Sequence, residues 1–286
     1  MLKKLFLLKV HLCKGIGLMT EQKIFTAFQF NDYQTNILEC CQLAGLTAAT
    51  TEKILINWNL PELSDNVKRH WFECKFISIL DEDYPAQLKE IYCPPIILFY
   101  RGKKELFSTK MLGVVGARQS TNYGKKVLLE LMPTMIENSI TIVSGLATGI
   151  DGISHQVALK YGGSTIGVIG TGLDQVYPRN HHELQSQMET HGLVISEYPL
   201  GTQPYRSHFP ERNRIISGLS ETLLVIEAKI KSGSLITANL ALQENRNVCA
   251  IPGRIDEQLS AGCNELIAAG AKPILTAKDI LNEFLI

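Results

Sequence analysis

The chain has 286 residues, of which 45% are hydrophobic and 20% charged, and its 28 basic and 28 acidic residues give a formal net charge of zero. A chain of this length can form one large core or two domains, and this composition excludes a disordered or uniformly basic protein. A function in binding nucleic acid would therefore have to rest on local clusters of basic residues.

Cysteine usage and hydropathy both indicate the cytoplasm. The seven cysteines are scattered and lack the short, paired spacing of zinc ligands, so we expect free thiols and no metal site. The apolar run Leu5–Leu8 is too short for a signal peptide, and no stretch approaches the ~18 apolar residues of a membrane span. These features predict a cytoplasmic protein that does not associate with a membrane.

In the first part of the chain, apolar residues recur at helical spacing, as at Leu5, Leu8 and Leu12, and glycine or proline breaks separate the runs. This pattern predicts a small helical domain over residues 1–75. The segment Lys14–Gly17 lies between two predicted helices and leaves two interpretations open. It is either a helix-hairpin-helix turn, whose backbone amides can bind a DNA phosphate, or an ordinary turn.

Residues 76–110 are expected to connect this domain to a second one and contain a short strand at Ile96–Tyr100. In residues 111–286, apolar strands alternate with helical patterns, which predicts a doubly wound, mostly parallel α/β sheet of the Rossmann-like kind. The predicted strands are Met111–Val115, Ile140–Val143, Thr165–Ile169, Leu193–Ser196, Thr222–Ile226 and Val248–Ile251. The predicted helices are Asn122–Glu137, Gly152–Tyr161, His181–Thr190, Asn213–Gly218 and Ser234–Asn245.

Basic residues gather in the segments that follow these strands. In sheets of this kind, ligands bind at the carboxyl ends of the strands. Glycines and hydroxyls near helix N-termini favour an anion there, and arginine adds forked donors that fit phosphate oxygens. Several phosphate sites along one edge suit a polynucleotide backbone, whereas a mononucleotide needs one or two. The basic residues are Arg118, Arg179, Arg212, Arg214, Lys229, Lys231 and Arg254.

Each of these residues taken alone could equally be a solvated surface charge, and Arg212 and Arg214 could instead be bound by Asn213 or Glu211 in a structural network. The collection on one sheet edge favours the binding interpretation.

Sequence signatures of enzymes are absent from the same segments. The glycines around Gly113 and Gly170 lack the third glycine of a dinucleotide fingerprint, and there is no Walker motif, so we expect no cofactor. Asp151 and His155 lie four residues apart, but no G-x-S-x-G motif presents a nucleophile beside them. We expect Asp151 to cap a helix, His155 to be a packed or hydrogen-bonded residue, and the protein not to be an enzyme.

Six blocks of sequence resemble the DprA/Smf family of DNA-processing proteins, and they occur in the order in which that family carries them. One departure is Ala117, where the family commonly has serine. The helical part, residues 1–75, is similar to the family's sterile-alpha-motif-like domain. The six blocks are Gly116–Arg118, Ser144–His155, Gly170–Pro178, Phe209–Leu219, Glu227–Ala238 and Gly262–Ala271.

The resemblance implies an extended Rossmann-like fold that binds single-stranded DNA without reacting on it. It also implies a homodimer that protects incoming DNA in natural transformation and loads the RecA recombinase. Carried over by position, the DNA-binding residues would be Arg118, Ser144, Gly145, Arg179, Arg212, Arg214, Lys229, Lys231, Ser232 and Gly233. A helix near Cys263–Ala269 would form the dimer and recombinase surface through Cys263, Leu266 and Ile267, with Leu266 and Ile267 exposed.

Two other functions stay open. Related Rossmann-like families include phosphoribohydrolases, so a hydrolase acting on a nucleotide derivative is the alternative, although the P-G-G-x-G-T-x-x-E signature of those enzymes is missing. An interaction protein with a vestigial pocket is the other. Stacking of bases on Tyr123, Tyr177, Tyr198 or Phe209 would support DNA binding.

Overall fold

The computed structural model describes residues 2–284. The chain forms two compact units. One contains the residues up to Tyr84 together with Cys93–Phe99, and the other contains Pro85–Tyr92 and the residues from Tyr100 onward.

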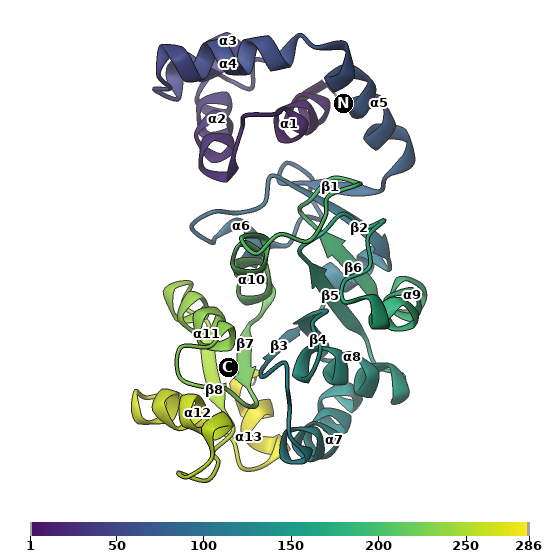
Figure 1. Ribbon diagram of the computed structural model, residues 1–286, viewed down its shortest axis with the longest axis vertical. Coiled ribbons are helices and arrows are strands. Elements are labelled where there is room, and N and C mark those ends of the chain that lie inside the picture. Colours follow the sequence, from purple (N-terminus) through teal and green to yellow (C-terminus); the bar gives the residue numbers. More distant parts are fainter. Residues whose placement is uncertain (1, 285–286) are drawn as a thin grey trace. The chain divides into compact units, whose positions relative to one another are not determined.

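Residues 2–73 of the first unit form five helices, where the sequence pattern predicted a small helical domain, and the strand β1 (Phe76–Ser78) also belongs to this unit (Figure 1). The side chains of Asn36 and Thr47 accept backbone hydrogen bonds at the starts of α3 and α4, and Pro61 opens α5, where a missing N–H costs nothing. In the core, the rings of Phe6 and Phe28 stack with their centroids 4.8 Å apart. The helices are α1 (Leu2–Leu12), α2 (Leu18–Phe30), α3 (Ile37–Leu43), α4 (Ala48–Trp58) and α5 (Pro61–Glu73).

Nine strands form one mixed sheet in the order β1-β2-β6-β5-β4-β3-β7-β8-β9. Strand β1 pairs antiparallel with β2, and the pairings from β6 through to β9 are parallel. The predicted α/β class and mostly parallel sheet are therefore confirmed. The strands are β1 (Phe76–Ser78), β2 (Ile97–Gly102), β3 (Met111–Val115), β4 (Thr141–Gly145), β5 (Thr165–Ile169), β6 (Leu193–Ser196), β7 (Thr222–Val225), β8 (Asn247–Ala250) and β9 (Lys272–Pro273).

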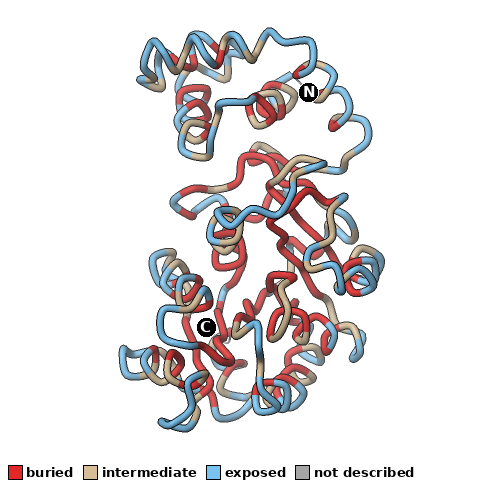
Figure 2. Tube along the Cα trace, viewed as in Figure 1, coloured by how far each residue is buried: buried red, intermediate tan, exposed pale blue. Residues whose placement is uncertain are grey.

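Helices cover both faces of the parallel part of this sheet (Figure 1). Helices α7 (Asn122–Glu137), α8 (Ile150–Lys160) and α9 (His182–His191) pack side by side, and α13 (Ala277–Leu281) packs on α7. Helices α10 (His208–Leu219) and α11 (Gly233–Gln243) pack together on the opposite face, while α12 (Gln258–Ala268) packs on β8. The strands between the layers are buried, and the outer helix faces are exposed (Figure 2). Short helical segments are α6 (Ala86–Lys89), η1 (Lys104–Ser108), η2 (Arg179–His181) and η3 (Asn282–Phe284).

The strand order reverses direction at β3. The chain passes from β3 to β4, β5 and β6 on one side, and β7, β8 and β9 lie on the other. Loops that leave β3 and β7 therefore diverge to opposite faces, which opens a crevice at the carboxyl ends of these strands.

Helix α10 begins at His208, five residues before the predicted start at Asn213. Pro210 lies in the first turn, where a helix tolerates proline because its missing N–H has no partner in the helix. As a result, Arg212 projects from the helix, as Arg214 does, and not from the loop before it.

Candidate nucleic-acid interface

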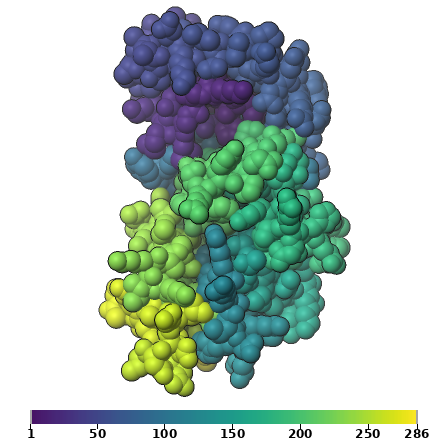
Figure 3. All heavy atoms as spheres, viewed as in Figure 1, coloured from purple at the N-terminus to yellow at the C-terminus, as the bar shows by residue number. Residues whose placement is uncertain are grey.

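A groove of about 1050 Å³ occupies the crevice between β3 and β7. Its walls come from the segments after β3, β4, β5, β6 and β7 and from the starts of α10 and α11. On the face seen in Figure 3, the blue-teal atoms that follow β3 lie between the green and yellow-green atoms of the segments that include α10 and α11. The charged residues that line the groove are Arg118, Asp151, Arg206, Arg212, Lys229 and Lys231.

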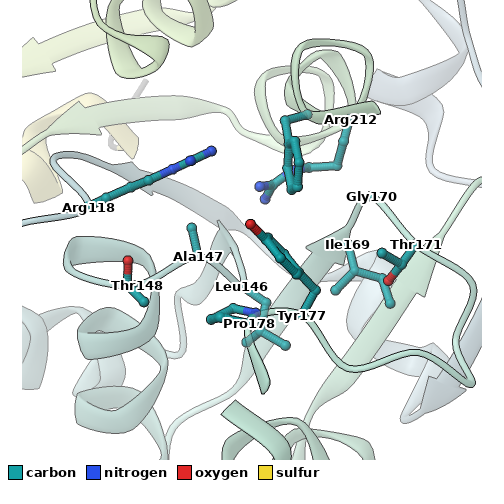
Figure 4. Close-up of a pocket in the computed structure, with 11 residues that line it drawn as sticks. Arg118, Leu146, Ala147, Thr148, Ile169, Gly170, Thr171, Tyr177, Pro178 and Arg212 are labelled. Carbon is teal, nitrogen blue, oxygen red and sulfur yellow. The ribbon is translucent and has the colours of Figure 1, made fainter. Parts of the chain in front are cut away.

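Tyr177 and Phe209 form an aromatic wall of the groove. The rings of Tyr177 and Phe209 have centroids 5.5 Å apart, and the guanidinium carbon of Arg118 lies 5.4 Å from the Phe209 centroid. These side chains surround a smaller cavity of about 120 Å³, toward which Arg118, Tyr177 and Arg212 extend from three different segments (Figure 4). Exposed aromatic faces beside guanidinium groups are the surfaces on which nucleobases stack.

The segment that carries Arg118 is held by a close backbone contact with the start of α8. Gly149 has a φ of +76°, and a Cβ there would lie 2.2 Å from the carbonyl oxygen of Ala117. The N–H of Ile150 donates to that same oxygen at 3.1 Å. Only glycine combines this backbone conformation with so close an approach, so Gly149 sets the path of the loop after β3.

Arg212 lies in the floor of the groove and is only 5% exposed. Its Nη1 donates to the carbonyl oxygen of Val168 at 2.9 Å and lies 4.0 Å from Oδ2 of Asp151. Its Nε is buried and has no hydrogen-bond partner among residues 2–284. A Cβ on Gly145 would lie 1.6 Å from Nη1, so this glycine makes the room that the guanidinium fills.

Burial raises the pKa of the Asp151 carboxyl and lowers the pKa of Arg212, while the opposite charge of each partner counteracts the shift of the other. Asp151 lies in the first turn of α8, and the N-cap residue is Gly149, so the prediction that Asp151 caps this helix is wrong. The structure uses Asp151 as the buried counter-ion of Arg212.

Arg214 does not line the groove. Its Nη2 donates to both carboxylate oxygens of Glu197, at 2.6 and 2.9 Å, and both side chains are buried. This partner is neither Glu211 nor Asn213, the residues considered from the sequence. Glu211 instead accepts a hydrogen bond from the hydroxyl of Tyr198.

Several other residues expected at the site also lie outside the described lining of the groove. Ser144 and Gly145 are buried at the end of β4, where the Ser144 hydroxyl donates to the carbonyl oxygen of Val114 at 2.5 Å. Arg179 is exposed in η2, and Arg254 is exposed and paired with Asp256 at 2.6 Å. The groove does contain Arg118, Arg212, Lys229, Lys231, Ser232 and Gly233.

Arg206 is a groove residue that the sequence analysis did not select. It is exposed and lies in the segment before α10, three residues from Phe209. That segment has no periodic pattern, so its path along the strand ends could not be read from the sequence. Its position within a loop after a strand was the only signal for it.

The surface expected for dimer formation is less exposed than predicted. Cys263 is fully buried, with its thiol 3.7 Å from the carbonyl oxygen of Val225, and Leu266 is 9% exposed. Ile267 is half-buried. The prediction that Leu266 is exposed is wrong because α12 turns this side toward β8.

His155 is fully buried, as expected for a packed residue. Its Nε2 lies 2.6 Å from the carbonyl oxygen of Gly145, and its Nδ1 lies 2.6 Å from the hydroxyl of Thr165. A carbonyl oxygen only accepts, so Nε2 carries the proton. Burial lowers the pKa of His155 to about 4, and the ring is therefore neutral near pH 7.

Within residues 2–284, no three His, Cys, Asp or Glu side chains come together in a way that could hold a metal ion. In the same part of the chain, no helix has the length and apolar character needed to cross a membrane.

The sequence and the fold of this chain both match those of known proteins. A family profile described as DNA recombination-mediator protein A matches residues 75–285. The DNA processing protein DprA of Streptococcus pneumoniae is 40% identical over 276 residues, which is 96% of this chain and 97% of the relative. The DprA of Bacillus subtilis is 47% identical over 208 residues, or 72% of this chain and 70% of the relative.

Solved structures of similar fold come from the same kind of protein as the relatives found by sequence. The X-ray structure of DprA from S. pneumoniae has a TM-score of 0.89 at 38% identity and covers 96% of this chain and 95% of its own. A DprA structure from Helicobacter pylori, described for its single-stranded DNA binding mode, has a TM-score of 0.67 at 30% identity and covers 74% of this chain and 96% of its own. The chain therefore belongs to the DprA/Smf family of DNA recombination-mediator proteins.

Proposed function

We propose that the groove between β3 and β7 binds single-stranded DNA. The observation that carries this proposal is the combination, in one groove, of exposed basic residues with the aromatic wall of Tyr177 and Phe209. Phosphates would be neutralised by Arg118, Arg206, Lys229 and Lys231, and an unstacked base would lie against the wall. The H. pylori relative, whose structure is described for this binding mode, supports the assignment.

Duplex DNA fits this groove less well. Its bases are stacked inside the helix, so they cannot reach an aromatic face without leaving the stack. A single strand exposes its bases, and every base has a face that can stack. The groove should therefore prefer single strands and tolerate many sequences.

The biological setting is proposed from family membership. A recombination mediator that binds incoming single strands in natural transformation would protect them and load the RecA recombinase. We propose that the protein acts in the cytoplasm as a homodimer, binds DNA without a cofactor and does not catalyse a reaction. The dimer and recombinase surface would include the exposed side of α12 near Ile267.

Fluorescence anisotropy of labelled single-stranded and duplex oligonucleotides tests the DNA-binding proposal. Arg118→Glu should abolish binding of single strands, because it reverses a charge in the groove. Lys160→Glu is the matched control, since Lys160 is exposed at the end of α8 that lies away from the carboxyl ends of the strands. Equal loss in the two variants would contradict the placement of the site, and absence of binding by the folded wild-type protein would contradict the function.

A further inference from the structure

The wall of the groove that follows β7 carries two exposed apolar side chains. Ile230 is 56% exposed and Ile236 is 47% exposed, and both line the groove. Ile230 lies between Lys229 and Lys231 in the sequence, and these lysines line the groove as well. Covering these exposed apolar side chains with a ligand contributes favourable free energy to binding, because it removes apolar surface from water.

The size of the groove leaves room for more than the base on the aromatic wall. A cleft of about 300 Å³ already encloses a ligand of the size of one nucleotide. The groove measures about 1050 Å³, whereas the small cavity beside Tyr177 and Phe209 measures about 120 Å³. Most of the groove therefore lies outside the aromatic cavity.

The segment that carries Ile230 is held in place. The N–H of Ala228 donates to the carbonyl oxygen of Leu259 at 2.7 Å, and the N–H of Gly262 donates to the carbonyl oxygen of Ala228 at 2.8 Å. A Cβ on Gly262 would lie 2.8 Å from that oxygen, so the two segments touch through their backbones. Lys231 adopts a φ of +58°, which non-glycine residues seldom adopt without support from their surroundings.

We propose that Ile230 and Ile236 form a second base-binding site, which holds another nucleobase of the same DNA strand. Lys229 and Lys231 neutralise the adjoining phosphates. The occupant follows from charge, because the basic residues Arg118, Arg206, Arg212, Lys229 and Lys231 line the groove. Among residues 2–284, the one acidic residue in its lining is Asp151, which is already the counter-ion of Arg212. This proposal rests on the proposed function, and it assigns one base to the aromatic wall and another to Ile230 and Ile236.

Aliphatic side chains contact a base through its face and make no hydrogen bonds to its edge. This site therefore adds affinity for a base of any identity. Because the segment is already ordered, little conformational entropy is lost when the base binds.

The test measures binding of an oligonucleotide and of the same oligonucleotide made with abasic residues. The variant carries Ile230→Ala and Ile236→Ala, both at exposed positions, so it should fold normally. It should bind the normal oligonucleotide about tenfold more weakly, at the low end of the loss of one stacked base, and bind the abasic one as the wild type does. The dependence of affinity on salt should not change, because no phosphate contact is removed.

Leu242→Ala is the matched control, since Leu242 is 53% exposed on the same helix, α11, and is not among the described residues that line the groove. It should leave both affinities unchanged. Equal weakening on the abasic oligonucleotide, or no weakening on either, would overturn the second base site while leaving DNA binding intact. Failure of the wild-type protein to bind any single strand would instead overturn the proposed function.

Discussion

The carboxylate of Glu227 accepts hydrogen bonds from both the backbone N–H and the hydroxyl of Thr121. Glu227 follows β7 and is 3% exposed, whereas Thr121 is the N-cap residue of α7 and ends the loop that carries Arg118. A Cβ on Gly124 would lie 2.5 Å from the same carboxylate. This contact links the two segments that diverge at the reversal of strand order, and so joins the two walls of the groove.

Replacing Thr121 with Val should therefore weaken both folding and DNA binding. The variant loses the helix cap and a hydrogen bond to a buried carboxylate, which together cost about 1–3 kcal/mol in the free energy of unfolding. Affinity for a single strand should also fall, because the loop that carries Arg118 loses its attachment to Glu227. Urea unfolding and anisotropy measure the two effects. Thr121→Ser keeps the hydroxyl and should restore both, and a Ser variant as weak as the Val variant would refute the linkage.

Gly149→Ala should disrupt the loop after β3. The new Cβ combines a backbone with φ +76° and ψ −133°, which residues other than glycine seldom adopt, with a clash against the carbonyl oxygen of Ala117. Gly162→Ala is a matched control, since Gly162 has a φ of +71° and a Cβ there would meet no neighbouring atom of residues 2–284 within 4 Å. Thermal unfolding should show a clearly larger loss at Gly149, and only Gly149→Ala should reduce DNA binding. Equal losses of stability in the two variants would mean that the contact between Gly149 and the carbonyl oxygen of Ala117 does not constrain the loop.

The buried pair of Asp151 and Arg212 predicts a loss of stability that depends on pH. Arg212→Met should cost about 3–5 kcal/mol in the free energy of unfolding at pH 8, because Asp151 is left as an uncompensated buried charge. Burial already raises the pKa of Asp151, and removal of the guanidinium raises it further. The cost should therefore shrink as the pH falls and Asp151 takes up a proton. Urea unfolding at pH 8 and pH 5 tests this, and a constant cost would contradict the pairing.

His155 should make the protein less stable in mild acid. Its pKa is about 4 in the folded protein, below the usual 6.5, so between these values the unfolded chain binds a proton that the folded chain does not. Stability is complete above pH 6.5 and is lost as the pH falls toward 4, by up to roughly 3 kcal/mol at about 1.4 kcal/mol per unit. His155→Gln should show a smaller change when unfolding is measured from pH 7 to pH 5. If the free energy of unfolding of His155→Gln fell as steeply with pH as that of the wild type, His155 would not be the cause of the acid sensitivity.

The strands of the parallel part of the sheet could be predicted from local sequence patterns. The strands β3, β5 and β6 have the predicted bounds because each is a short apolar run that ends at a glycine or a polar residue. Strands β1 and β9 have three and two residues, too few for a periodic pattern, and neither was predicted.

The site was only partly predictable because charge alone does not reveal burial. Arg118, Lys229 and Lys231 line the groove as expected for exposed cations, but Arg214 is neutralised by Glu197, which lies 17 residues earlier and outside the same helix. Leu266 is another case, since the pattern of a short helix does not show which side packs against β8. Pairings of this kind depend on the tertiary structure.

The most direct test of the groove as a DNA-binding site is the salt dependence of single-strand affinity for the wild type and for Arg118→Gln. Each neutralised phosphate contributes a slope of roughly −0.7 to the plot of log affinity against log salt. The wild-type affinity should fall with salt, and Arg118→Gln should bind more weakly with a slope less negative by about that amount. Lys160→Gln should match the wild type. A wild-type affinity that does not depend on salt, or an unchanged slope in Arg118→Gln, would contradict a phosphate-binding groove at this sheet edge.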